Sequence, residues 1–294
     1  PKTLFFNKGT TCQLAALKTV CNNKNNQRVV LHPKSHIALD EQDAYQELMG
    51  LKGILIGHEN APFSIKELEA VSPQVAVLTV ELPLRRVGFK LTEWDELLKM
   101  RQWCNDHQVH FHLDGARLWE STHWYKKTEA EICSLFDSVY VSLYKGIGGM
   151  SGALLAGSDE YLKQCQVWRD RLGSNMYTTF PALITGLEGL DRNLTQIPSW
   201  VDRAHEISSQ LNLLPELTVE TPHTNGFWVK LKGDKVTINQ KLKQLQMDSK
   251  LTLCRPFESL EHESFLYTEI QVGAEHQNIT TSEITRFFKD LLSR

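Results

Sequence analysis

The chain has 294 residues, of which 41% are hydrophobic and 23% charged, and its net charge is -3 at pH 7. This composition predicts a globular protein with one large or two medium domains, and it argues against nucleic acid or an acidic membrane as a partner. No apolar run is long enough to span a bilayer, and the six cysteines are scattered without a C-x-x-C pair. We therefore expect a cytoplasmic protein with reduced thiols. Because the sequence begins with Pro1, we also expect that an N-terminal piece of the natural protein is missing from it.

Strand and helix patterns alternate through the first part of the chain. Ser64 and Glu67 fit a capping box, and the nearly continuous apolar run at 74–82 is typical of a strand covered on both faces. This alternation predicts a mostly parallel sheet with helices on both faces. In chain order, we expect a helix at 10–21, a strand at 29–33, a helix at 44–49, strands at 53–57 and 74–82 with a helix at 64–71 between them, a helix at 92–107, and strands at 109–114, 138–144 and 152–157.

The pattern changes after about residue 159. Helical stretches at 161–172 and 182–213 are followed by short strands and two helices, and a second capping box, Thr280 and Glu283, opens the last helix. The short strands are expected at 217–220, 226–231 and 265–273. We therefore predict an α/β fold with a large domain over residues 1–180 and a smaller α+β domain over residues 181–294.

Two charged residues stand at the ends of predicted strands. Asp114 ends the strand at 109–114, and Lys145 follows the strand at 138–144. Because open parallel sheets bind ligands at the carboxyl ends of their strands, we expect both side chains in one crevice. A partly desolvated lysine near a carboxylate suits Schiff-base chemistry, and the glycines after Lys145 allow a tight turn beside a bulky ligand. An ordinary salt bridge between Asp114 and Lys145 explains the same pattern, and the spacing alone leaves both readings open.

Two further patterns are less specific. Gly9 and Thr10 open a helix after a turn, which is either a phosphate cradle or a simple helix start. His110, His112 and Asp114 alternate on one strand face as H-x-H-x-D, a pattern that can bind a metal. Gly115 stands where metallohydrolases have a further histidine, and no other His/Cys cluster has a telling spacing. We therefore expect no metal site.

Taken together, the segments GTTCQLAAL, HPKSH, HFHLDGARLWES and VSLYKGIGG resemble the pyridoxal-phosphate-dependent threonine aldolases. These belong to the β-eliminating lyase family and have the aspartate-aminotransferase-type fold, called fold type I. The resemblance implies pyridoxal 5'-phosphate as the cofactor. It gives these roles: Lys145 forms a Schiff base with the cofactor, Asp114 pairs with the pyridine nitrogen, Arg117 lies near the ring oxygen and the substrate carboxylate, His36 stacks on the ring, and Gly9 and Thr10 bind the phosphate.

The reaction that the resemblance implies is cleavage of a β-hydroxy-α-amino acid, threonine or allo-threonine, to glycine and an aldehyde. It also implies a homo-oligomer, either a dimer or a tetramer, with a small-molecule amino acid substrate. From charge and hydropathy, as above, we expect neither nucleic acid nor a membrane as a partner. Two alternatives remain open at this point. One is another pyridoxal-phosphate-dependent β-eliminating lyase or an aminotransferase-like enzyme, and the other is an inactive member of the fold that acts as a binding protein.

Three positions depart from the family pattern. Leu84 or Arg85 stands in place of a histidine in the family's THN segment, Tyr177 replaces a phosphate-binding arginine, and Tyr267 lies near the position of a substrate-binding arginine. Arg85 and Arg255 are candidates to bind the substrate carboxylate instead. The base that takes the β-hydroxyl proton is left open among His36, a bound water and a water held by an arginine.

Overall fold

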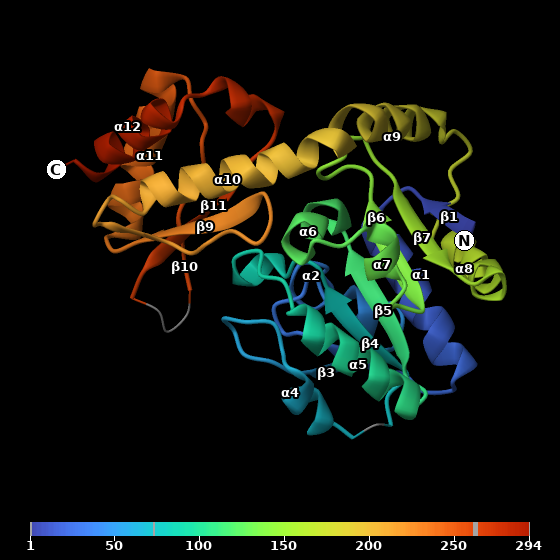
Figure 1. The fold of residues 1–294 in the computed structure, drawn as a ribbon. Helices are drawn as coiled ribbons and strands as arrows, with labels where there is room; N and C mark the ends of the chain where they lie inside the picture. The colour runs from blue at the N-terminus through green and yellow to red at the C-terminus, as the bar shows by residue number, and fades with distance from the viewer. Residues whose placement is uncertain (1, 73, 261–263, 294) are drawn as a thin grey trace. The chain divides into compact units, whose positions relative to one another are not determined.

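The computed structural model describes residues 2–72, 74–260 and 264–293 (Figure 1). The chain forms two compact units, Pro1–Thr195 and Gln196–Arg294, and each is described by itself. The domain boundary predicted between residues 180 and 181 would place helix α9 (Phe180–Asn193) in the smaller domain, and it stays a prediction.

Within the described residues, the first unit is built on a seven-stranded sheet in the order β1-β7-β6-β5-β4-β2-β3. Strands β6, β5, β4, β2 and β3 are parallel, whereas β7 runs antiparallel to both β6 and β1. The predicted mostly parallel sheet is confirmed. The strands are β1 (Lys2–Phe6), β2 (Arg28–Leu31), β3 (Lys52–Leu55), β4 (Val77–Glu81), β5 (His110–Gly115), β6 (Ser138–Ser142) and β7 (Ala153–Gly157).

Helices of this unit alternate with the strands, as the sequence predicts. The capping box at Ser64 and Glu67 is confirmed, and a further one at Thr128 and Glu131 opens α7. The helices are α1 (Gly9–Asn23), α2 (His36–Leu39), α3 (Ala44–Glu47), α4 (Ile65–Glu69), η1 (Arg85–Val87), α5 (Trp94–Asp106), α6 (Leu118–Tyr125), α7 (Glu129–Cys133), α8 (Asp159–Arg171) and α9, with η2 (Leu194–Gln196) after it.

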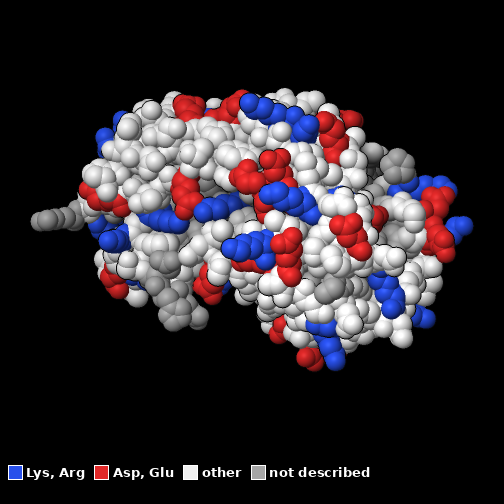
Figure 2. All heavy atoms as spheres, turned by 60° about the horizontal axis from the view of Figure 1, so that its bottom comes forward, with Lys and Arg blue, Asp and Glu red and all other residues white. Residues whose placement is uncertain are grey.

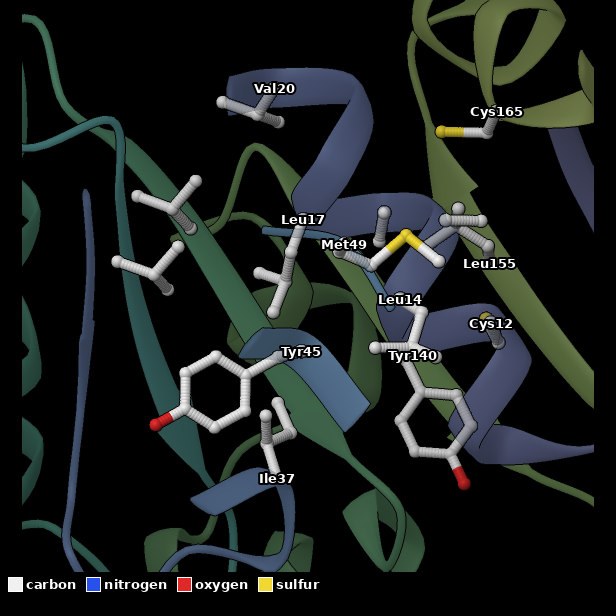
Figure 3. Packing of buried hydrophobic residues seen from close by; sticks show 14 of the residues in the cluster. Cys12, Leu14, Leu17, Val20, Ile37, Tyr45, Met49, Tyr140, Leu155 and Cys165 are labelled. Atoms are coloured by element: carbon white, nitrogen blue, oxygen red, sulfur yellow. The ribbon is translucent and has the colours of Figure 1, made fainter. Parts of the chain in front are cut away.

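Two apolar cores cover the two faces of this sheet, because alternate strand residues point to opposite sides. Figure 3 shows the first core, where Leu14 and Leu17 of α1 lie near Tyr140 of β6 and Leu155 of β7. The second core packs α4, α5 and α7 against the other face, with Phe111 of β5 fully buried there. Burial on both faces explains the continuous apolar run predicted for β4.

The second unit contains a four-stranded antiparallel sheet, counted over its described residues, in the order β10-β11-β9-β8. The predicted α+β character of the C-terminal part is confirmed, as is the capping box at Thr280 and Glu283. Its elements are α10 (Ile197–Leu211), β8 (Leu217–Val219), β9 (Gly226–Leu231), α11 (Lys235–Ser249), β10 (Glu258–Ser259), β11 (Leu266–Gln271), η3 (Ala274–Asn278) and α12 (Thr281–Leu292).

The helical stretch predicted over 182–213 is interrupted. It forms α9 and α10, with the short η2 between them. Pro198 lies in the first turn of α10. Its ring has no N–H group and would clash with the carbonyl four residues earlier, so one continuous helix cannot form.

The surface carries charges of both signs, and the described helices lack the hydropathy of membrane spans, as the composition indicates. On the face drawn in Figure 2, basic and acidic side chains are interspersed. Over the described residues, every helix is too short or too polar to cross a bilayer.

Candidate active site

The sheet of the first unit gathers the predicted site residues at one edge. Strand β1 runs in the same direction as the parallel strands, since β7 is antiparallel to both β1 and β6. The carboxyl ends of β1, β2, β4, β5 and β6 therefore lie at the same edge. The residues that the chain places there are Gly9 and Thr10 after β1, His36 after β2, Glu81 at the end of β4, Asp114 near the end of β5, and Lys145 after β6.

Lys145 lies on a tight turn and not in the strand predicted to reach it. β6 ends at Ser142, and the Gly149 N–H then donates to the Leu143 carbonyl at 2.7 Å. The Gly148 N–H donates to the Lys145 carbonyl at 2.9 Å, and Gly148 has a φ of 81°. This left-handed conformation favours glycine, which explains why a glycine stands at position 148 of the turn.

Burial lowers the pKa of the Lys145 amine from its ordinary value, and the positive charge of Arg117 lowers it further. The carboxylates of Asp114 and Glu81 act in the opposite direction. A lowered pKa leaves more of the amine neutral at a given pH, and the neutral form is the nucleophile. The group is therefore suited to attack a carbonyl compound.

Asp114 and Glu81 are direct neighbours on β5 and β4. Both are buried, and the Asp114 Oδ1 accepts a hydrogen bond from the Ala116 N–H at 3.2 Å. Burial, with the nearby charge of Asp114, raises the pKa of Glu81 to about 7. Sequence reasoning missed Glu81, although it closes a strand beside β5 in the same way that Asp114 ends its own strand.

His36 begins α2 and is held by two carboxyl groups. Its backbone N–H donates to the Glu81 Oε2 at 2.7 Å, and its Nδ1 donates to the Glu41 Oε1 at 3.1 Å. The Glu41 hydrogen bond raises the pKa of the His36 imidazole, while burial opposes this effect. The charges of Asp114 and Lys145 also act on the ring, so the structure brings His36 to the same edge. The role of Glu41 was not predicted.

Gly9 begins the fifteen-residue helix α1, whose N-cap residue makes no side-chain capping bond. The Gly9 N–H donates to the Tyr144 Oη at 3.3 Å, which brings the start of α1 beside the residue that precedes Lys145. A Cβ atom at Gly9 would lie 2.2 Å from the Tyr140 Oη, a residue visible in Figure 3. Only glycine allows this approach. Thr10 follows in the first helical turn.

The predicted arginines fall in different parts of the chain. Arg117 directly precedes α6 and lies over the Phe89 ring, 5.4 Å from its centroid. Arg85 begins η1, and its charge acts on the Lys145 amine. Arg255 belongs to the second unit, where its carbonyl accepts a hydrogen bond from the Thr268 hydroxyl at 2.6 Å.

The two histidines of the H-x-H-x-D pattern are within hydrogen-bond distance of a serine hydroxyl and are not arranged as metal ligands. His110 Nε2 and His112 Nδ1 both lie 2.7 Å from the Ser138 Oγ. Burial lowers the pKa of His112 to about 3 and that of His110 to about 4. Over the described ranges, no group of three or more His, Cys, Asp or Glu residues has the geometry to hold a metal ion.

The residues at this edge match what pyridoxal phosphate requires. They provide a primary amine of lowered pKa, a buried carboxylate for a ring nitrogen, and a helix N-terminus for a phosphate group. The close approach at Gly9 leaves the first backbone N–H groups of α1 beside the lysine turn. The donor set therefore fits this cofactor.

The fold and this arrangement define a class of protein, and comparisons with known proteins agree. A pyridoxal-phosphate-bound protein from Clostridium difficile 630, provisionally named as an aminotransferase, has the same fold, with a TM-score of 0.67. That match is 15% identical and covers 99% of this chain and 77% of the other, so it shows the fold alone. The class is fold type I, as the sequence predicts.

Closer relatives define the family. A Listeria monocytogenes EGD-E protein, provisionally named as an L-allo-threonine aldolase, is 31% identical, with a TM-score of 0.91, over 98% of this chain and 81% of the other. The low-specificity L-threonine aldolase of Candida albicans is 25% identical over 50% of this chain, and the match spans 39% of that protein's length. The beta-eliminating lyase family matches residues 1–234. The chain belongs to the β-eliminating lyase family.

Proposed function

We propose that the chain is a pyridoxal-phosphate-dependent aldolase that cleaves a β-hydroxy-α-amino acid, threonine or allo-threonine, to glycine and an aldehyde. The single observation that supports it most is the half-buried amine of Lys145, with a lowered pKa, at the sheet edge where Asp114 lies. When bound, pyridoxal phosphate supplies an acceptor for the electron pair that the broken Cα–Cβ bond leaves on Cα.

The residues of this chain have distinct roles in the proposal. Lys145 holds the cofactor through its amine, and the Asp114 carboxylate holds a proton on the ring nitrogen. Gly9 and Thr10, at the N-terminus of α1, bind the phosphate. Arg117 binds the substrate carboxylate, for which a guanidinium is the best-matched partner.

His36 is the base in this proposal. Its Nδ1 donates to the Glu41 carboxyl, which leaves Nε2 to take the β-hydroxyl proton of the substrate. Arg85 supports the substrate carboxylate, since its charge acts on the same lysine. Arg255 is a further candidate for that task.

We also propose that the chain forms a homo-oligomer. One side of α9 carries an exposed apolar stripe at helical spacing, in which Phe180, Ile184 and Leu187 are 61%, 59% and 63% exposed. Exposed apolar patches of this kind mark association surfaces. The opposite side of the same helix packs on the lysine turn, because a Cβ atom at Gly189 would lie 2.2 Å from the Ile147 carbonyl oxygen.

A product assay tests the proposed reaction. The protein with pyridoxal phosphate should release glycine and acetaldehyde in equal amounts from threonine or allo-threonine. Lys145→Ala should lower the rate by more than about a thousandfold, and Lys163→Ala, at an exposed position of α8, should leave it unchanged. An oxo acid with ammonia would contradict the aldolase and favour another lyase. Cofactor binding without any product would favour a binding protein.

A further inference from the structure

Glu120 is a buried carboxyl group that the proposed function does not use. It lies in the first turn of α6, three residues after Arg117, and its residue surface is 1% exposed. A Cβ atom built on Gly146 would lie 2.2 Å from the Glu120 Oε1 and 3.0 Å from its Cδ. The carboxyl group therefore lies directly against the residue that follows Lys145.

One oxygen of this buried group, Oε2, makes no hydrogen bond within the described part of the chain. Leaving a carboxyl oxygen buried and unpaired costs about 1–3 kcal/mol, so such a group in a native site needs an explanation. Burial raises the pKa of Glu120, and three interactions oppose this effect: the charge of Arg117, a hydrogen bond from its own backbone N–H and the charge of Lys145. All three favour the ionised carboxylate.

The charged groups that act on the Lys145 amine come from several elements: β4, β5, η1 and the residue before α6. Asp114 and Glu81 are the acidic groups that favour its positive charge, and Arg117 and Arg85 oppose it. His36 also senses the charge of Lys145. Glu120 differs from the other acids because it touches the lysine turn itself, while Asp114 and Glu81 lie on the neighbouring strands.

We propose that Glu120 is a positioning residue for Lys145: its carboxylate supports the turn that carries the lysine and supplies negative charge beside the lysine nitrogen. This inference rests on the proposed function, since it concerns the lysine that holds the cofactor. A carboxylate there stabilises positive charge on the nitrogen when the cofactor is bound to it. It also fixes the distance between the lysine turn and the segment that carries Arg117.

Glu120→Gln tests the charge, because the amide keeps the shape of the side chain. The visible absorbance of the loaded protein is titrated with pH, which reports the proton on the lysine–cofactor nitrogen. We expect the midpoint to fall by about 1 pH unit in Glu120→Gln. Glu160→Gln, an exposed position of α8, is the matched control and should titrate like the parent. A purely structural role would not move this midpoint.

Gly146→Ala tests the contact. The backbone of Gly146 lies outside the left-handed region, so alanine is strained there only by the Glu120 carboxyl. We expect Gly146→Ala to weaken pyridoxal phosphate binding at least tenfold, measured by absorbance titration. The double variant Glu120→Ala/Gly146→Ala should bind more tightly than Gly146→Ala alone, because the shorter side chain removes the clash.

The outcomes separate this inference from the function on which it rests. A parent protein that shows the lysine–cofactor band, with a Glu120→Gln titration identical to it, would overturn the role of Glu120 and leave the aldolase proposal standing. A Gly146→Ala variant that binds like the parent would also overturn it. A parent without any band would overturn the proposed function, and the inference with it.

Discussion

At the residue scale, buried carboxyl groups of the site adjust the charge of their neighbours. His36 must be neutral to act as a base, and the Glu41 hydrogen bond raises its pKa. The rate should therefore fall on the acid side at a pH above that expected for a free imidazole. This is because a raised pKa keeps the His36 imidazole protonated, and therefore inactive as a base, up to a higher pH.

Glu41→Gln should move that limb of the pH–rate profile. The amide is a weaker acceptor than the carboxylate, so the pKa of His36 should fall and the acid limb should shift down by about 1 pH unit. The measurement is kcat/KM for the amino acid substrate between pH 5 and 9. Glu47→Gln, at an exposed position of α3, serves as the control. A limb that stays in place in Glu41→Gln would exclude His36 as the base.

Site residues at the ends of predicted strands could be predicted from the strand pattern of the sequence, and those elsewhere could not. Asp114 and Lys145 were predictable because each lies at a strand end, and parallel strands share an edge. Glu81 follows the same rule and was overlooked. Glu41 and Glu120 could not be found in this way, because Glu41 lies in the loop between α2 and α3 and Glu120 lies on α6. They reach the site through contacts that strand alternation does not encode.

At the element scale, helix α9 has two different sides: one packs closely against the lysine turn, and the other is exposed and apolar. Gly186 and Gly189 face the segment around Lys145, where a Cβ at Gly186 would lie 3.1 Å from the Leu143 Cδ1. The opposite side exposes the apolar stripe of Phe180, Ile184 and Leu187. One helical stretch was predicted here and its division was missed, although Pro198 is the residue that interrupts it. Strand β1 was not predicted, although it is as long as other strands that were.

The stripe gives a direct prediction. Ile184→Glu/Leu187→Glu places charges on the proposed interface and should convert the oligomer to a monomer, measured as molar mass by sedimentation velocity. Glu188→Gln, exposed on the same helix, should leave the mass of the parent unchanged. A parent that is monomeric at every concentration, or a double variant of unchanged mass, would contradict the association surface.

At the scale of the whole molecule, alternation predicted the mostly parallel sheet, and the change in pattern after residue 159 predicted the α+β character of the C-terminal part. The antiparallel pairing of the C-terminal strands was not predicted. The identity of the substrate was not predictable either, because the threonine and allo-threonine readings differ in the configuration of one hydroxyl-bearing carbon. Likewise, the sequence gives no role to Tyr177, which is fully exposed, or to Tyr267, whose ring lies tilted against Trp228 with centroids 4.1 Å apart. Pocket shape at that level follows from side-chain packing, which composition and periodicity leave undetermined.

The central claim is that Lys145 holds the cofactor, and covalent trapping tests it most directly. The protein is loaded with pyridoxal phosphate, reduced with borohydride and digested, and the labelled peptide is identified by mass spectrometry. We predict that the label lies on the peptide that contains Lys145 and is lost in Lys145→Ala but not in Lys163→Ala. A label on another lysine, or no label in the parent protein, would contradict the account.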